Sequence, residues 1–211
     1  FSEVNQVYIE SQNVQVVRRV SGGGAVYHDL GNICFTFFVP VATSASVDFH
    51  QFVKPMADAL ESLGIHVDIS GRNDLEIAEK KVSGNAQRYA GGYLMNHGKL
   101  LWDTDVDAMV RSLNVADEKF ISKAAKSVRA RVGNIKDYAP EGLTISTFID
   151  QLKYYLTDEG KDTEYVLSEA QKASIKKLRD EKFSQWAWNY GKGPQFMYNN
   201  HAKYDGGAIH V

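Results

Sequence analysis

The sequence predicts an α+β domain in which helices flank a mixed or antiparallel β-sheet. Short segments rich in β-branched and aromatic residues are separated by glycine-containing turns, a spacing typical of hairpins and meanders. One long segment between them, residues 44–63, repeats its apolar side chains every three or four positions and predicts a helix. Further segments with helical periodicity follow in the last third of the chain. The pattern therefore favours a hairpin-rich sheet with one long inserted helix.

The first strands are expected on either side of a glycine-rich loop. Residues 14–17 form a β-branched run, and residues 25–29 resume β character after three consecutive glycines. Residues 32–39 are apolar and aromatic along their whole length, which predicts a strand buried on both faces. The spacing of apolar residues within residues 2–11 predicts a short helix before these strands.

The helix over residues 44–63 has recognisable ends. Ser46 or Asp48 can cap its N-terminus, and Gly64 ends it. Pro55 lies inside the segment and is expected to shift the start of the helix or to kink it.

Shorter elements follow. Strands are expected over residues 65–69 and 75–77. Residues 87–96 and 99–102 predict a hairpin or meander, with one turn at Gly91-Gly92 and the next near His97-Gly98. Helices are expected over residues 105–113, 145–156 and 168–183, with Thr144 or Ser146 as the cap of the second. We interpret the apolar stripes of the last two helices as core packing, and the segment from Phe196 onward as the entry to another β unit.

Composition narrows the class of protein. The chain has 211 residues, 44% of them hydrophobic, which is ordinary for a globular protein and enough for one large domain. Its net charge of −2 gives no basic field of the kind that attracts nucleic acid, so no nucleic-acid partner is expected. No apolar run approaches the roughly 18–20 residues needed to cross a membrane. With one cysteine, Cys34, no disulfide can form within the chain, which fits a cytoplasmic location.

Several common catalytic patterns are missing from the sequence. The histidines have no zinc-site spacing, no Gly-x-Ser-x-Gly elbow is present, and the three glycines are not followed by the Lys-Ser/Thr of a Walker loop. The glycines are expected to join strand to strand, so no helix N-terminus is expected to bind phosphate there. Cys34 stands among apolar residues in mid-strand, which favours a buried, inert thiol over a nucleophile.

Three polar clusters remain, and each lies at a strand end or a turn, where binding sites are usually built. They are Arg18–Asp29, Gly71–Asp74 and Lys81–Gly84. Together they offer guanidinium groups, a carboxylate, a carboxamide and an ammonium, a set that suits a phosphorylated or adenylated ligand. The glycines alone fit a tight turn with exposed arginines equally well, and the cationic segment 119–131 fits either a solvated face or an anion contact. The residues by themselves indicate an anion-binding α+β domain and leave its dependence on a nucleotide open.

Five segments of the chain resemble the motifs of the lipoate–protein ligase A family, in the order and spacing of that family. They are Arg18–Asn32, Gly71–Leu75, Lys81–Ala86, His97–Leu101 and Lys126–Ile135. Trp186–Pro194 is similar to the tryptophan-rich segment that leads into the family's C-terminal accessory domain. The resemblance covers nearly the whole chain and implies the catalytic fold that lipoate–protein ligases share with biotin–protein ligases.

The resemblance implies an enzyme that works in two steps. Lipoate and ATP, with Mg²⁺, would give lipoyl-AMP and pyrophosphate, and the lipoyl group would then pass to a lysine amine of a carrier protein. The implied carriers are the lipoyl domains of 2-oxoacid dehydrogenase complexes and the glycine-cleavage H protein.

The resemblance also implies roles for individual residues. Lys81 would be the catalytic residue, because it would contact the carboxyl oxygen of lipoate and the α-phosphate in both steps. Asn73 and Asp74 would face ATP, with Asp74 as a candidate ligand of Mg²⁺. The residues implied in binding lipoate, ATP or lipoyl-AMP are Arg19, Ser21, Gly22, Gly23, Gly24, Ala25, Val26, Tyr27, His28, Asn73, Asp74, Ser83, Gly84, His97 and Gly98.

Structural readings of the same residues stay open. Lys81 also fits a solvated lysine at a strand edge, Asp74 a turn cap and His97 a turn histidine. The acyl chain of lipoate needs an apolar tunnel, and the candidates for it rest on strand position only. They are Val17, Val26, Phe35 and Phe37.

Two other functions compete with the ligase. An ATP-independent lipoyl or octanoyl transferase of the same fold usually relies on a catalytic cysteine, for which a buried Cys34 is a poor candidate. A non-catalytic module that binds lipoyl carriers is disfavoured by the intact Lys81.

We expect residues 1–190 to form the catalytic domain without its N-terminal strands, and residues 191–211 to be a linker and the start of a truncated accessory domain.

Overall fold

The computed structural model describes residues 3–41, 48–71, 73–113 and 131–191, and the backbone of residues 201–204 and 207–210. The chain divides into two compact units, and each is described by itself. The first contains Phe1–Gln15 and Arg19–Tyr165, and the second contains Val16–Arg18 and Val166–Val211.

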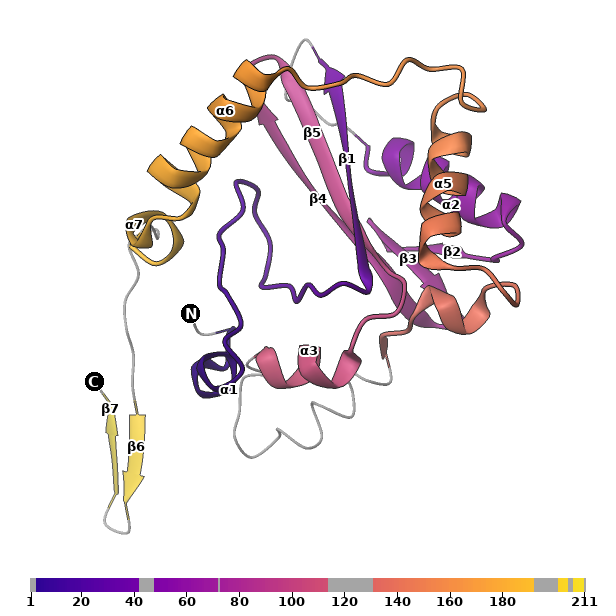
Figure 1. The fold of residues 1–211 in the computed structure, drawn as a ribbon. Coiled ribbons are helices and arrows are strands. Elements are labelled where there is room, and N and C mark those ends of the chain that lie inside the picture. Colours follow the sequence, from indigo (N-terminus) through magenta and orange to yellow (C-terminus); the bar gives the residue numbers. More distant parts are fainter. Residues whose placement is uncertain are drawn as a thin grey trace. The chain divides into compact units, whose positions relative to one another are not determined.

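Both units contain helices and strands (Figure 1). The elements of the first unit are α1 (Gln6–Ser11), β1 (Asn32–Pro40), α2 (His50–Ser62), β2 (Asp68–Ser70), β3 (Asp74–Ile77), β4 (Lys80–Ala90), β5 (Tyr93–Leu101), α3 (Val106–Ser112), the 3₁₀ helix η2 (Ile135–Tyr138) and α5 (Ile145–Leu156). Those of the second unit are α6 (Glu169–Leu178), the π-helix η3 (Arg179–Phe183), α7 (Trp186–Asn189), β6 (His201–Tyr204) and β7 (Gly207–His210).

A five-stranded sheet in the order β1-β5-β4-β3-β2 forms the centre of the first unit, and each of its strand pairs is antiparallel. This confirms the hairpin-rich sheet that the sequence predicts. Gly91 and Gly92 make the turn between β4 and β5 with φ of +59° and +79°, a backbone conformation that favours glycine. The short strands β2 and β3 are the first two strands of the meander that continues through β4 and β5.

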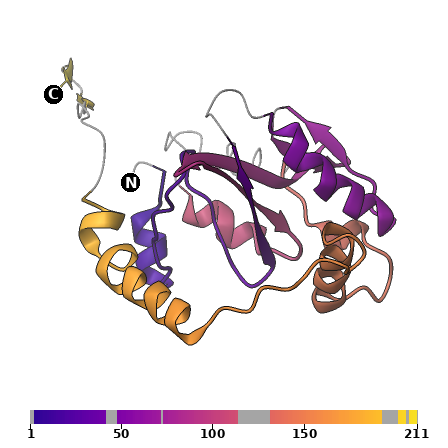
Figure 2. The same ribbon diagram turned by 90° about the horizontal axis from the view of Figure 1, so that it is seen from above.

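Helices α2 and α5 cover one face of this sheet (Figures 1 and 2), and the hydrophobic core lies between them and the strands. Leu60 of α2, Leu100 of β5 and Phe148 of α5 are fully buried. Trp102 stacks on Phe148 with their ring centroids 4.4 Å apart. Burial of each such large apolar side chain stabilises the fold by about 1.5–3 kcal/mol, so these contacts fix the position of the sheet.

The helices of the first unit follow the sequence pattern closely. The predicted helix over residues 145–156 is confirmed with Thr144 as its cap, because the Thr144 side chain accepts a hydrogen bond from the backbone N–H of Thr147. Asp105 caps α3 in the same way. Helix α2 begins at His50 and contains Pro55 in its second turn, whereas residues 44–47 of the predicted helix lie outside the described residues.

The segment from Arg19 to Gly31 crosses the other face of the sheet, beside α1 and α3 (Figure 1). Asp29 fixes the end of this segment. One oxygen of its carboxylate accepts hydrogen bonds from the backbone N–H of Gly31 and the side chain of Asn32, and the other accepts one from the backbone N–H of Asp105. The chain thereby enters β1 with the preceding loop lying over the strands.

Several predicted strands are wrong. Residues 14–17 and 25–29 have no regular secondary structure. In the second segment, backbone groups bond to distant side chains rather than to a neighbouring strand. The N–H of Ala25 donates to Glu3, and the carbonyl of Tyr27 accepts from Lys99. The predicted strand 65–69 is shortened to β2. His97 and Gly98 are not near a turn, since both lie inside β5.

The prediction that residues 32–39 are buried on both faces is also wrong. Strand β1 is an edge of the sheet, and its side chains alternate between the core and the opposite face. Phe35 and Phe37 pack against the core, whereas Cys34 and Phe38 are exposed. A run of apolar residues alone does not distinguish the two faces.

The second unit is built on α6 and α7, together with the backbone of Val16–Arg18. The Asn189 side chain accepts a hydrogen bond of 2.8 Å from the backbone N–H of Arg18, and the Trp188 indole donates one of 2.8 Å to the Arg18 carbonyl. The interpretation of the 168–183 stripe as core packing is wrong, since Ile175 and Leu178 are about half exposed. In the described part of the chain, no helix is long and apolar enough to cross a membrane.

Candidate active site

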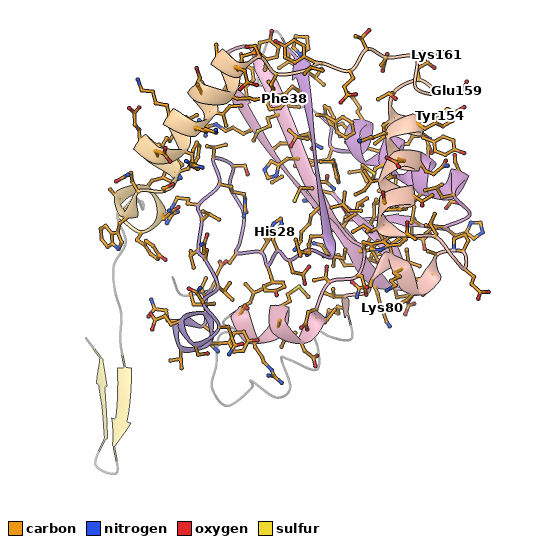
Figure 3. The ribbon with its side chains drawn as sticks, viewed as in Figure 1. His28, Phe38, Lys80, Tyr154, Glu159 and Lys161 are labelled. Atoms are coloured by element: carbon orange, nitrogen blue, oxygen red, sulfur yellow. The ribbon has the colours of Figure 1, made fainter. Side chains whose placement is uncertain are left out.

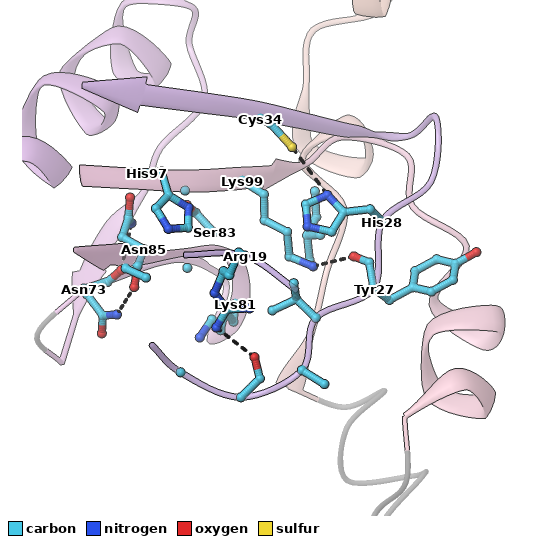
Figure 4. A pocket seen from close by; sticks show the side chains of 18 of the residues that line it. Arg19, Tyr27, His28, Cys34, Asn73, Lys81, Ser83, Asn85, His97 and Lys99 are labelled. Carbon is cyan, nitrogen blue, oxygen red and sulfur yellow. Dashed lines mark hydrogen bonds between the residues drawn. The ribbon is translucent and has the colours of Figure 1, made fainter. Parts of the chain in front are cut away.

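A groove with a cavity volume of about 510 Å³ lies in the first unit, between the glycine loop (residues 19–28) and the sheet (Figure 4). Its walls are Arg19, residues 22–28, residues 34–36, Asn73, Lys81, residues 83–86, residues 97–99, Leu101, Met109, Leu113 and Val132. Of the site residues that the sequence predicts, only Ser21 and Asp74 are not among these walls, and each of them contacts one. The structure therefore brings the three predicted polar clusters together.

The floor of the cavity is set by the register of β1, β5 and β4. Cys34, Lys99 and Gly84 lie directly opposite one another across these strands, so their side-chain positions share one face. Gly84 and its neighbour on this face, Ala86, are small, which leaves room for a ligand above the strands. Gly98 faces the opposite way, because a Cβ there would lie 2.4 Å from the Asn85 side-chain oxygen.

Three hydrogen bonds hold the glycine loop on this floor. Ser21 Oγ lies 2.5 Å from His97 Nε2, Arg88 Nη1 donates to the Val20 carbonyl at 2.8 Å, and Lys99 Nζ donates to the Tyr27 carbonyl at 2.7 Å. All three anchors stand on β4 or β5. The loop is thus a fixed wall of the groove.

Arg19 organises the glycines. Its guanidinium donates to the carbonyls of Gly22 and Gly24, at 2.7 Å and 2.9 Å. A Cβ at Gly23 would lie 2.7 Å from the Arg19 Nη2 atom, and its φ is +102°. The backbone conformation therefore favours glycine at position 23, and a side chain there would make the Arg19 guanidinium shift.

Lys81 and Asp74 form an ion pair on the floor. Lys81 Nζ lies 2.7 Å from Asp74 Oδ2, with the lysine side chain 43% exposed and the carboxylate 26% exposed. Asp74 Oδ1 is buried and has no hydrogen-bond partner among the described residues. Part of the ammonium is therefore exposed to the groove, whereas Asp74 Oδ1 is shielded from solvent.

Asn73 is positioned by Asn85. The Asn73 amide donates to the Asn85 carbonyl at 2.5 Å, and the Asn85 amide donates to the Asn73 carbonyl at 2.8 Å. This reciprocal pair pins the turn that precedes Asp74 onto β4. Asn85 belongs to the quoted Lys81–Ala86 motif, yet sequence reasoning gave it no role.

Burial lowers the pKa of three side chains in the groove, and neighbouring cations lower it further. Burial is the first cause of the lowered pKa of His28, followed by Lys99 and Arg19. Burial and then Arg19 lower the pKa of His97. Burial lowers the pKa of Lys99 to about 8. The field of the groove is positive, and it favours an anionic ligand.

The prediction that Cys34 is buried and inert is wrong in its first part. The residue is exposed and lines the groove. Its Sγ atom lies 3.4 Å from His28 Nδ1 (Figure 4), and Figure 3 shows where His28 lies in the fold. Partial burial of the thiol raises its pKa, so Cys34 is not an activated thiolate.

Of the four candidates for the apolar tunnel, Val26 and Phe35 line the groove, whereas Val17 and Phe37 do not.

Lys99 is the main groove residue that sequence reasoning missed. It belongs to the quoted motif His97–Leu101, and strand alternation places it on the same face as His97. That alternation was readable only once residues 97–98 were assigned to a strand rather than to a turn.

The predicted cationic segment 119–131 lies outside the described residues except for Arg131.

Comparison with protein families places these features in a known context. The model of the lipoyl protein ligase A/B catalytic domain matches residues 1–157. Lipoate–protein ligase 1 of Staphylococcus aureus is 38% identical over 209 residues, which cover 99% of this chain and 64% of that protein. The chain thus spans just under two thirds of the length of this relative.

Solved structures of similar fold point the same way. A bipartite lipoate protein ligase from Thermoplasma acidophilum, described with its E2 lipoyl domain, superposes with a TM-score of 0.78 at 30% identity, over 93% of this chain and 78% of that one. A lipoate–protein ligase A bound with ATP superposes with a TM-score of 0.71 at 26% identity, over 90% of this chain and 77% of that one. The predicted catalytic fold of lipoate–protein ligases is thereby confirmed.

Proposed function

Because the chain belongs to the lipoyl protein ligase A/B family, we propose that it joins lipoate to a lysine of carrier proteins, using ATP and passing through lipoyl-AMP. The observation that carries the proposal is the convergence of Lys81, Arg19 and the glycine loop on one positively charged groove. An acyl-adenylate has a long apolar arm and a phosphate. The groove offers apolar walls at Val26 and Phe35 beside these cations.

Lys81 is the proposed catalytic residue of both steps. In the first, a carboxylate oxygen of lipoate attacks the α-phosphorus of ATP and pyrophosphate leaves. In the second, the amine of the carrier lysine attacks the acyl carbonyl carbon and AMP leaves. Negative charge grows on oxygens around the α-phosphate in each step, and an ammonium fixed beside them stabilises it.

Gly84 and the glycine loop give this ammonium its working space. A Cβ at position 84 would lie 3.2 Å from Lys81 Nζ and 3.6 Å from Asp74 Oδ1, so a larger residue would crowd the ion pair. Residues 22–24 on the opposite wall add no side-chain bulk, which lets a phosphate approach the backbone. Arg19 supports that wall. The other groove residues are proposed to complete the binding surface for lipoate and ATP.

The residues present fit one protein ligand of Mg²⁺. Mg²⁺ in nucleotide sites is commonly held by one or two carboxylates together with the substrate's phosphates. The buried Oδ1 of Asp74 has no partner among the described residues and lies on the carboxylate nearest Lys81. When bound there, the ion would neutralise phosphate charge, and Asn73 would help to hold the turn that carries Asp74.

Lipoyl domains of 2-oxoacid dehydrogenase complexes are the proposed carriers, with the glycine-cleavage H protein as a second. A ligase of similar fold is described together with an E2 lipoyl domain, which supports the first of these. We also propose that residues 1–190 serve as the catalytic domain and that residues 191–211 lead into an accessory domain.

The test is an assay of the purified protein with an apo lipoyl domain, lipoate, ATP and Mg²⁺. We expect pyrophosphate release, and a carrier whose mass increases by one lipoyl group. Omission of ATP should abolish both signals. If neither pyrophosphate nor a mass increase appears while the carrier is shown to accept lipoate from another ligase, the proposed function is wrong.

One observation keeps the ATP-independent transferase as a second candidate: Cys34 lies in the groove beside His28. The raised pKa of the thiol argues against a nucleophile. We therefore expect Cys34→Ser to retain ATP-dependent lipoylation within about a factor of 3, since the change replaces one small side chain by another on an exposed floor position. The measurement is carrier mass against time. Transfer from octanoyl carrier without ATP that disappears in Cys34→Ser would support the transferase instead.

A further inference from the structure

Lys99 is a lysine on the floor of the groove that the proposed reaction does not yet use. We propose that Lys99 binds the anionic group of the acyl substrate, the carboxylate of lipoate before activation and the phosphate of lipoyl-AMP after it, from the sheet side of the groove. Arg19 approaches the same space from the loop side (Figure 4). The inference rests on the proposed function and adds a third cation to Lys81 and Arg19.

The surroundings of Lys99 leave its ammonium available. Its neighbours across the strands are Cys34, an uncharged thiol, and Gly84, which has no side chain. An ammonium has three N–H donors, and the one described hydrogen bond of Lys99 uses a single donor on the Tyr27 carbonyl. Among the described residues, no carboxylate forms an ion pair with it. At least two donors can therefore turn toward a ligand in the cavity.

The charges around Lys99 make the site selective for anions. Lys81 on β4 and Arg19 on the loop repel its positive charge, and Asp29 at the end of the loop attracts it. His28 also faces it from the loop, and Cys34 from β1. Burial is the largest influence and brings the pKa of Lys99 to about 8. A bound carboxylate or phosphate would relieve the repulsion, because it pairs with the cations that surround it.

This arrangement predicts the sign of a pH effect. Lys99 is mostly protonated at pH 7 and loses its charge as the pH rises through about 8. An anion prefers the charged form, so its affinity should fall as the pH is raised above that value. A neutral ligand of the same shape should bind equally well across this range.

Lys99 could instead serve only to tie the loop to the strand through Tyr27. Lys99→Gln separates the two roles, because glutamine keeps an N–H donor on the same strand position and removes the charge. Lys54→Gln is the matched control. It removes one positive charge from an exposed ion pair on α2, outside the groove.

The experiment measures binding of lipoate and of its neutral amide, lipoamide, by calorimetry at pH 7 and pH 9. We expect Lys99→Gln to weaken lipoate about 10- to 100-fold at pH 7, the usual loss for a hydrogen bond to a charged group, and to leave lipoamide unchanged. Wild-type protein should lose lipoate affinity between pH 7 and pH 9 and keep lipoamide affinity. The pH effect on lipoate should be smaller in Lys99→Gln, and Lys54→Gln should match wild type.

Different outcomes count against different parts of the reasoning. Equal loss of lipoate and lipoamide in Lys99→Gln would show a role in holding the loop, and unchanged lipoate binding would show none; either overturns the inference and leaves the ligase proposal standing. If wild-type protein binds neither lipoate nor a non-hydrolysable lipoyl-adenylate, the proposed function itself fails. The pH dependence of wild-type protein tests the inference even if Lys99→Gln does not fold.

Discussion

Lys81→Ala is expected to slow both half-reactions by about 10²–10³-fold or more, the loss typical when one preorganised group that stabilises the transition state is removed. The ammonium lies in the groove beside Gly84 and is held by Asp74 at 2.7 Å. Its removal leaves growing phosphate charge without its nearest cation. The first step is measured as lipoate-dependent pyrophosphate release, and the second as transfer to carrier from chemically prepared lipoyl-AMP.

Lys80→Ala provides the matched control on the same strand. Lys80, labelled in Figure 3, is the first residue of β4. It is not among the residues that line the groove. Its stem packs near Gly133, so the substitution tests the effect of losing a neighbouring lysine on folding without touching the groove. We expect activity within about a factor of 3 of wild type, as for most substitutions away from a site. Transfer from preformed lipoyl-AMP at an undiminished rate in Lys81→Ala would refute the role in the second step.

The fold was predictable where local signals and long-range packing agree. The Gly91-Gly92 turn, the Thr144 cap and the amphipathic helix α5 each depend on neighbouring residues, and each is found where the sequence places it. In the glycine-loop segment, the local pattern predicts strands, but the long-range contacts do not form them. Its extended backbone bonds to Glu3 and Lys99 rather than to a strand, and no local pattern reports partners so far away in the chain.

The site was predictable as a set of residues but not as a geometry. Motif resemblance selected the residues that line the groove, and the pairing of Asp74 with Lys81 agrees with their being predicted together. Orientation was harder to predict. Cys34 was assigned to the interior because its neighbours are apolar, although β1 is an edge strand with one open face. Lys99 was missed because His97 was assigned to a turn, which hid the alternation that points both residues into the groove.

Gly31→Ala is expected to cost about 3 kcal/mol or more of unfolding free energy, at the upper end for overpacking because the obstacle is backbone. A Cβ at this position would lie 2.1 Å from the Asp103 carbonyl oxygen and 2.3 Å from its carbon. The Gly31 carbonyl accepts hydrogen bonds from the backbone N–H groups of Trp102 and Asp103, at 2.9 Å and 3.1 Å. Moving the chain to relieve the clash would therefore break the join between the loop and the end of β5.

Gly22→Ala is the control that isolates this effect. No atom lies within 4 Å of a Cβ built there, and its φ is outside the left-handed range, so we expect stability within about 0.5 kcal/mol of wild type. Urea unfolding measures both variants, and equal midpoints would contradict the role of Gly31. Because Asp29 and Gly31 anchor the segment that forms one wall of the groove, Gly31→Ala should also weaken lipoate binding in whatever fraction still folds. Stability and binding share this anchor, since the wall that contacts the ligand is fixed by the same few hydrogen bonds that start β1.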